Sequence, residues 1–131
     1  MSLERLLQIM DKLRSPEGCP WDREQTHESL KRYLIEEAYE VLEAVDSGDP
    51  NMLADELGDV LLQVVFHAQI AKEQGTFTMN DVIEAISSKL VRRHPHVFGE
   101  VEVETVSDVV RNWDAIKRAE KQGQARTSLL D

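Results

Sequence analysis

Four glutamates fall within the twelve residues LIEEAYEVLEAV at positions 34–45, whose apolar spacing otherwise predicts a helix packed against a core. The next predicted helix adds a second acidic set within ADELGDVLLQVVFHA, residues 54–68. Carboxylates at half-buried positions are unfavourable unless they are protonated, paired or bound to a cation. These two stretches are therefore where the chain is expected to carry chemistry.

Helical geometry separates the four glutamates of the first stretch into two pairs. Because successive residues turn by about 100°, Glu37 lies about 60° and Glu40 about 120° from the centre of the apolar stripe, on the same side. Glu36 and Glu43 point nearly the opposite way, which leaves Glu36 only a supporting role beside the site. The stripe itself is Leu30, Leu34, Ala38, Val41 and Val45.

The second helix carries two stripes, and its acidic residues occupy one of them. The main stripe is Leu53, Leu57, Val60, Val64 and Ala68, and the second is Met52, Glu56, Asp59, Gln63, Phe66 and Ile70. A helix with two such stripes is expected to be covered on both sides, by another helix or by another chain. This predicts a homo-oligomer, most simply a dimer, with a five-helix monomer as the alternative.

Two carboxylate pairs with i, i+3 spacing on adjacent antiparallel helices can converge on one point. Glu37, Glu40, Glu56 and Asp59 would then repel one another unless a divalent cation compensates them. An all-oxygen ligand set favours Mg²⁺ or Mn²⁺ over zinc. The alternative is a solvated acidic face without a metal.

Other metal sites fit the sequence less well. A di-iron bundle requires Glu-x-x-His, but Val64 stands three residues before His67. The single cysteine, Cys19, has no zinc-like spacing to the histidines. His94 and His96 are interpreted as loop residues on either side of Pro95.

The periodicity and the Gly and Pro positions predict an all-α helical bundle of about five helices in one domain, residues 1–131. Helices are expected at about 2–14, 26–47, 50–74, 78–93 and 107–122. Residues 15–26 are interpreted as a loop, residues 101–106 (VEVETV) as a possible short strand without a partner, and about 123–131 as a flexible tail.

Composition excludes several classes of partner. The 25 acidic and 15 basic residues give a net charge of −10, which argues against binding to nucleic acids or anionic membranes. No apolar run approaches the roughly 20 residues of a membrane span. The lone cysteine cannot form an internal disulfide, and the amphipathic N-terminus is unlike a signal peptide. A cytoplasmic location is expected.

Two cations occupy positions that the apolar pattern of residues 78–93 reserves for hydrophobic side chains. Lys89 and Arg93 fall on the stripe formed by Met79, Val82, Ile83, Ile86 and Leu90. Long basic side chains can lie along apolar surface and place their charge at its edge, where they would contact phosphates. The alternative is a structural ion pair with Glu37, Glu40 or their neighbours.

The acidic stretches also resemble a known family. EEAYE followed by ELGD fits the Glu-Glu-x-x-Glu, spacer, Glu-x-x-Asp motif of the MazG family of nucleoside triphosphate pyrophosphohydrolases. GCPWDREQTHESL, ELGDVLLQVVFHAQIA and KLVRRHPHVFG are similar to that family as well, so the resemblance covers residues 3 to about 120. The short acidic motif alone is shared with dimeric dUTPases, a dCTP pyrophosphatase group and phosphoribosyl-ATP pyrophosphohydrolases.

The resemblance implies an α-helical fold that assembles as a dimer or dimer of dimers and hydrolyses nucleoside triphosphates to monophosphate and diphosphate. It implies Mg²⁺ ligands at Glu37, Glu40, Glu56 and Asp59. Catalytic roles are expected for Glu37, Glu40, Lys89 and Arg93, with Glu40 or a neighbouring carboxylate orienting water, and substrate contacts for Lys89, Arg93, Trp113 and Lys117.

Many members of that family carry two modules in tandem, and the chain most resembles the first. It is therefore interpreted either as a short protein or as one module of a longer one. The alternative function is a non-catalytic helical dimerisation module. No stretch can be interpreted as a base-specific pocket.

Overall fold

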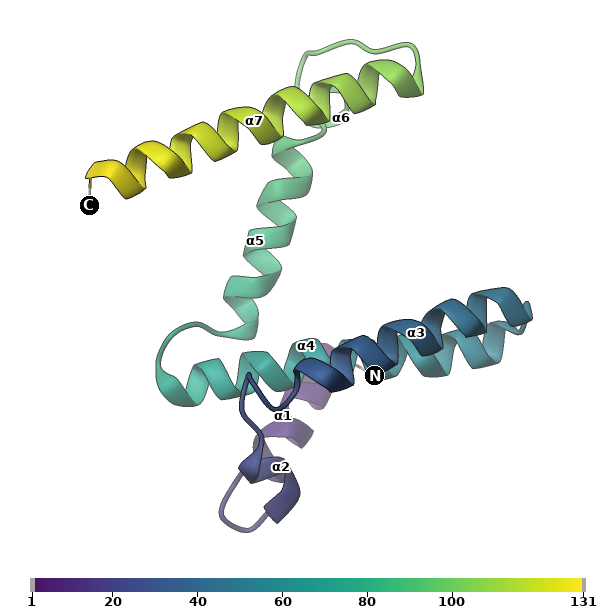
Figure 1. Cartoon of the computed structure of the whole chain (residues 1–131), viewed down its shortest axis with the longest axis vertical. Coiled ribbons are helices and arrows are strands. Elements are labelled where there is room, and N and C mark those ends of the chain that lie inside the picture. Colours follow the sequence, from purple (N-terminus) through teal and green to yellow (C-terminus); the bar gives the residue numbers. More distant parts are fainter. Residues whose placement is uncertain (1, 131) are drawn as a thin grey trace. The chain divides into compact units, whose positions relative to one another are not determined.

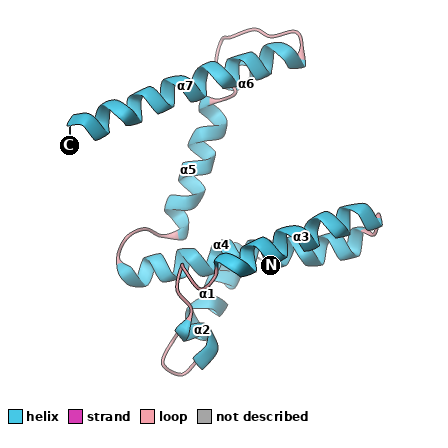
Figure 2. Cartoon of the chain, viewed as in Figure 1, coloured by secondary structure: helices cyan, strands magenta, loops and turns pink. Residues whose placement is uncertain are grey.

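The computed structural model describes the backbone of residues 2–130 and the side chains of residues 2–123, and this part of the chain contains helices and loops but no strand (Figure 2). The helices are α1 (Leu3–Leu13), α2 (Pro20–Glu24), α3 (Lys31–Ser47), α4 (Pro50–Gln74), α5 (Met79–Arg92), α6 (Pro95–Phe98) and α7 (Val106–Leu130). The all-α prediction is confirmed. None of the described helices combines the length and apolar character that crossing a bilayer requires.

The chain divides into two compact units, Met1–Val82 and Ile83–Asp131. The first unit contains α1 to α4 and the start of α5, and the second contains the rest of α5 with α6 and α7. Each unit is described by itself. The single domain over residues 1–131 stays a prediction.

The turn between α3 and α4 forms as the sequence predicts. Gly48 adopts a left-handed conformation with φ 72°, which ends α3 without the steric strain a side chain would cause there. The Asp49 carboxylate accepts a hydrogen bond from the Asn51 N–H at 2.9 Å, and Pro50 occupies the first turn of α4. This two-residue connection makes α3 and α4 an antiparallel hairpin, whose helices lie side by side in Figure 1.

Several predicted boundaries were wrong, each for a local reason. The expected loop at 15–26 contains α2, which begins at Pro20. The helix expected from Thr26 begins at Lys31, because Thr26 and Ser29 exchange side-chain to backbone hydrogen bonds in a separate turn. Pro95 begins the short α6 where only a helix end was expected.

The C-terminal region also differs from the prediction. Residues 101–104 have no regular structure, so the suggested strand at 101–106 is absent. The last helix begins at Val106 and continues to Leu130, beyond the expected end near Gln122. The absence of a clear apolar period after residue 122 did not prevent the backbone from remaining helical.

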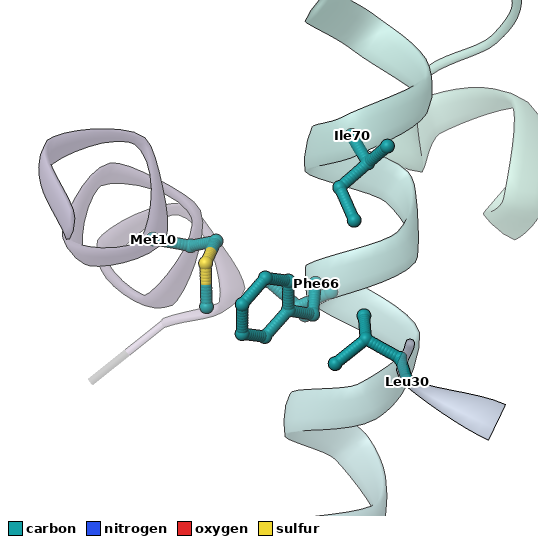
Figure 3. Close-up of a cluster of buried hydrophobic side chains, with 5 residues drawn as sticks. Met10, Leu30, Phe66 and Ile70 are labelled. Atoms are coloured by element: carbon teal, nitrogen blue, oxygen red, sulfur yellow. The ribbon is translucent and has the colours of Figure 1, made fainter. Parts of the chain in front are cut away.

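The apolar core of the first unit lies where α1 crosses the second half of α4. Phe66 points from α4 between Met10 of α1 and Leu30, with Ile70 one turn along (Figure 3). All four residues are at most 3% exposed. Each such buried side chain contributes about 1.5–3 kcal/mol relative to an exposed one. The second stripe of α4 is thus covered, at this end, by a helix of the same chain.

The other end of the hairpin is much less covered. Leu34 and Val45 of the predicted inner stripe of α3 are 42% and 57% exposed, and Leu57 of the main α4 stripe is 49% exposed. Within the first unit, α1 packs on α4 near its C-terminal half only. The parts of both stripes that lie at this end of the hairpin therefore lack a covering layer from their own unit.

The Arg14 side chain forms hydrogen bonds that connect the region after α1 to the C-terminal end of α4. Its side chain is 8% exposed, and its Nε and Nη2 both donate to the Glu73 carboxylate at 2.9 Å. Its Nη1 donates to the carbonyl oxygens of Asp22 and Gln25. The Arg14 guanidinium holds the pKa of Glu73 below its usual value.

We expect Arg14→Met to lower the free energy of unfolding by about 2–3 kcal/mol at pH 7, because Glu73 and two carbonyls lose their donor. The larger loss of unfolding free energy that follows the breaking of a fully buried ion pair is not expected, since the Glu73 side chain is 39% exposed. A lowered pKa stabilises the fold above the unfolded value of about 4.5, and this contribution is lost as pH falls below it. Urea unfolding at pH 7, 4 and 3 should show the difference from wild type shrinking with acidity.

Arg5→Met is the matched control for that measurement. Arg5 is exposed on the same helix, so its replacement should change the free energy of unfolding by less than about 0.5 kcal/mol. A difference between wild type and Arg14→Met that stays constant from pH 7 to pH 3 would contradict the role given to Glu73.

Candidate metal centre

The α3–α4 hairpin brings together the four carboxylates that the sequence selected. Glu37 and Glu40 of α3 and Glu56 and Asp59 of α4 each offer one oxygen, and these oxygens all lie within 4.8 Å of one another. The short turn at Gly48 sets the register that places the two i, i+3 pairs opposite each other. No other group of three or more His, Cys, Asp or Glu side chains within residues 2–123 is arranged to hold a metal ion.

The cluster lies at the edge of the hairpin, partly removed from water. Glu37, Glu56 and Asp59 are half-buried and Glu40 is exposed. One oxygen each of Glu37 and Glu56 is buried without a hydrogen-bond partner among the described residues. Glu36 and Glu43 are exposed, as the helical wheel predicts. The cluster therefore contains acceptor oxygens for which the described chain supplies no donor.

Proximity and burial oppose full ionisation of the cluster. Burial, then the charges of Glu40 and Asp59, raise the pKa of Glu37. The pKa of Glu56 is raised to about 7, first by a hydrogen bond shared with Glu40, then by burial and by the neighbouring carboxylates. With a pKa of about 7, Glu56 is protonated in part of the molecules at neutral pH when no cation is bound.

The donor set fits a hard divalent cation. Ligands on opposite sides of Mg²⁺ stand about 4.2 Å apart, since each Mg–O distance is about 2.1 Å. The four oxygens all lie within 4.8 Å of one another, a separation close to that of such ligands. The cluster offers neither nitrogen nor sulfur, which favours Mg²⁺ or Mn²⁺ over zinc. The two buried oxygens without donors support the same assignment.

The second unit contains the residues that were predicted from the sequence to contact the substrate. Lys89 is half-buried on α5, while Trp113 and Lys117 belong to α7. Arg93 follows α5 directly and donates from Nη2 to Glu120 Oε1 at 2.8 Å, and Arg92 binds the other oxygen of Glu120. Their positions relative to the carboxylates of the first unit are not determined.

Arg93 forms an ion pair within its own unit, with Glu120 on α7. The alternative that pairs it with Glu37, Glu40 or their neighbours stays a prediction. The hydrogen bonds from Arg93 and Arg92 lower the pKa of Glu120 to about 2. Lys89 has no ion pair among the described side chains.

The second unit also buries a group of polar side chains that includes His96, which was not among the expected site residues. Arg93 Nε, His96 Nδ1 and Trp113 Nε1 are buried and have no partner among residues 2–123. The His94 ring lies 5.4 Å from that of Trp113 and 5.5 Å from that of His96, between centroids. His94 and His96 were interpreted only as residues flanking Pro95. The run RRHPHVFG was the available signal, but its spacing alone does not reveal the packing against α7.

Comparison with known proteins identifies the family. Residues 25–98 match the model of the MazG nucleotide pyrophosphohydrolase domain, more than half of the chain. The chain belongs to the MazG family. The matched range contains all four clustered carboxylates together with Lys89 and Arg93, whereas Trp113 and Lys117 lie beyond it.

Longer curated proteins contain similar segments. The chain is 58% identical over 127 residues to the nucleoside triphosphate pyrophosphohydrolase/pyrophosphatase MazG of Thermotoga maritima, covering 97% of this chain and 48% of that protein. It is 58% identical over 123 residues to the uncharacterized protein YabN of Bacillus subtilis, covering 94% and 25%. It is 52% identical over 130 residues to the nucleoside triphosphate pyrophosphohydrolase of Escherichia coli K12, covering 98% and 49%.

The chain thus spans about a quarter to a half of the length of these curated relatives. A solved structure of a MazG-related protein from Thermotoga maritima has the same fold. The two match with a TM-score of 0.72 at 30% identity, over 88% of this chain and 99% of that one.

We expect Glu56→Gln to raise the thermal midpoint of the metal-free protein at pH 8, because it removes a carboxylate that its neighbours disfavour as an anion. The raised pKa of Glu56 also means that the wild type gains stability as pH falls from above 7 towards 4.5, where folded Glu56 binds a proton that unfolded Glu56 does not. Thermal melts in chelator from pH 8 to pH 5 should show this gain in wild type and less of it in the variant.

Glu43→Gln provides the control on the outer face of α3, where the side chain is exposed. It should leave both the midpoint and its pH dependence close to wild type. A Glu56→Gln midpoint below that of Glu43→Gln at pH 8 would count against repulsion within the cluster.

Proposed function

We propose that the chain hydrolyses nucleoside triphosphates, NTPs and dNTPs, to nucleoside monophosphate and diphosphate with Mg²⁺ or Mn²⁺ held by Glu37, Glu40, Glu56 and Asp59. The observation that carries this proposal is the set of four carboxylate oxygens within 4.8 Å of one another in a member of the MazG family. Two curated relatives of known name are nucleoside triphosphate pyrophosphohydrolases, which supports the same reaction.

The four carboxylates differ in exposure, which suits them to different roles in the reaction. A bound divalent cation would neutralise the triphosphate and make the α-phosphorus more electrophilic. The half-buried Glu37, Glu56 and Asp59 are held in place by the hairpin and suit the role of fixed ligands. Glu40 is the exposed member, so it is the carboxylate most accessible to water and we assign it the orientation of the attacking water.

Substrate binding is assigned to Lys89, Arg93, Trp113 and Lys117. The buried Nε of Arg93 and Nε1 of Trp113 are donors without acceptors in the described chain, and a triphosphate or a nucleobase supplies acceptors. Arg93 shares Glu120 with Arg92, so the carboxylate keeps one cationic partner if Arg93 turns to a phosphate. Activity on intracellular nucleotides would place this function in the cytoplasm, in maintenance of the nucleotide pool.

We also propose that the active form is a homodimer or a dimer of dimers. The support is the uncovered end of the hairpin, where large apolar side chains of α3 and α4 are 39–64% exposed. These residues are Leu34, Ile35, Tyr39, Leu42, Val45, Met52, Leu57 and Leu61. Monomers rarely expose contiguous apolar surface on this scale, and a second copy would cover it.

Incubation of the chain with a panel of NTPs and dNTPs and Mg²⁺ should release diphosphate. Glu37→Gln, Glu40→Gln, Glu56→Gln and Asp59→Asn should each lose at least about 100-fold in activity while remaining helical by circular dichroism, because a missing ligand or water-orienting group acts at the reacting phosphorus. Glu43→Gln should retain wild-type activity. Absence of release with every nucleotide by intact wild type would favour the rival function, a non-catalytic dimerisation module.

Lys89→Met should raise KM or lower kcat about tenfold, which is 1.4 kcal/mol, with little change in thermal midpoint, because Lys89 has no ion pair to lose among the described residues. Arg93→Met should produce the same kinetic loss and also lower the midpoint, since Glu120 loses one partner. Steady-state kinetics and thermal melts on the same samples separate the two effects.

Arg92→Met is the matched variant for Arg93, because it removes only the other hydrogen bond to Glu120. It should lower the midpoint without reducing kcat/KM. If Arg93→Met and Arg92→Met behave alike in both measurements, Arg93 is a structural residue and the phosphate contact is wrong.

Sedimentation velocity at micromolar concentration should show a dimer or tetramer. The physical reason is the apolar stripe of α3 and α4 that the first unit leaves uncovered. A stable monomer at that concentration would mean that this surface is covered within one chain, as in the five-helix monomer.

A further inference from the structure

Gln63 is a buried polar residue whose hydrogen bonding is incomplete. Its side chain lies on α4, the residue is 6% exposed, and Oε1 is buried without a partner among the described residues. Gln69 on the same helix is 8% exposed, but its amide donates to Asp11 Oδ1 at 3.0 Å and to Glu73 Oε2 at 3.1 Å. An unpaired buried acceptor is unfavourable, so its retention at Gln63 needs an explanation.

Gln63 continues the stripe of α4 that carries the clustered carboxylates. It follows Asp59 by four residues, which places the two side chains on one face with Cβ atoms about 6 Å apart. Glu37 Oε2 and Glu56 Oε2 are the other side-chain oxygens in residues 2–123 that are buried without a partner. All three belong to the α3–α4 hairpin, which also carries the proposed metal centre.

A hydrated cation supplies donors in this region. Mg²⁺ binds six oxygens and keeps several waters, so the four carboxylate oxygens leave room for water in its shell. Gln63 lies about 6 Å along the helix axis beyond Asp59, slightly more than one turn, which is far for a direct ligand and suitable for a bridging water. A carboxamide also accepts such a bond without adding a fifth negative charge to the cluster.

We propose that Gln63 is a positioning residue of the metal centre, whose side-chain oxygen accepts a hydrogen bond from a water in the hydration shell of the bound cation. This inference rests on the proposed function, because it requires a cation at the four carboxylates. Gln63 acts through that water and not as a ligand. Its hydrogen bond is satisfied only when the cation is bound, so it strengthens cation binding without stabilising the metal-free fold.

The test compares Gln63→Met with Gln69→Met, the same substitution at equally buried positions of one helix. MgCl2 or MnCl2 is the sole ligand, and the measurements are the thermal midpoint in chelator and the dissociation constant from calorimetric titration. Gln63→Met should melt at or above the wild-type temperature and bind the cation about tenfold more weakly, the lower end of the range for such outer partners. Gln69→Met should melt lower and bind with wild-type affinity, because its bonds hold the fold.

The possible results of these measurements distinguish the role of Gln63 from the existence of the metal centre. Wild-type cation affinity in Gln63→Met would overturn the inference and leave the metal centre standing. A fall in the metal-free midpoint as large as that of Gln69→Met would also overturn it, since Gln63 would then hold a structural hydrogen bond. Failure of the wild type to bind either cation would overturn the proposed metal centre, and the role of Gln63 with it.

Discussion

Mutual repulsion among four carboxylates is the constraint on which the first unit depends. The oxygens of Glu37, Glu40, Glu56 and Asp59 lie within 4.8 Å of one another because a two-residue turn fixes the register of two helices. The pKa of Glu56 rises to about 7 as a consequence, so full ionisation of the cluster at neutral pH is unfavourable without a cation. The hairpin must therefore be stabilised by contacts away from the cluster.

Those contacts are unevenly distributed. The core around Phe66 and the Arg14–Glu73 pair both act on the C-terminal half of α4, where α1 packs. The half that carries Glu56 and Asp59 is bordered by exposed apolar side chains such as Leu57. The clustered carboxylates and the exposed apolar side chains thus lie at the same end of the hairpin. A second layer of protein at that end would bury the apolar side chains and shield the charges.

Local signals in the sequence were sufficient to predict which four carboxylates lie close together. The caps at Gly48 and Gly75 and the spacing of Glu37, Glu40, Glu56 and Asp59 lie within single helices or one turn, and helical geometry converts them directly into positions. The bounds of α4 were predicted correctly for the same reason.

The features that were missed depend on partners distant in sequence. Arg14 pairs with Glu73 across 59 residues, and Arg93 pairs with Glu120 across 27, so neither partner follows from periodicity. The helix α2 and the burial of His96 and Trp113 depend on packing of this kind as well. The predicted stripe of α3 is buried at Leu30 but exposed at Leu34 and Val45, because an apolar stripe indicates which face of a helix is expected to be buried and not whether one chain covers all of it.

The Gly48 turn also has a consequence for the order of folding. It joins neighbouring helices with few residues between them, and such short-range contacts form early because little chain entropy is lost in closing the loop. We therefore expect the carboxylates to come together before α1 docks on Phe66, at a stage when little apolar burial opposes their repulsion. On this order of events, we expect the refolding rate of the hairpin to depend on the ionic composition of the solvent.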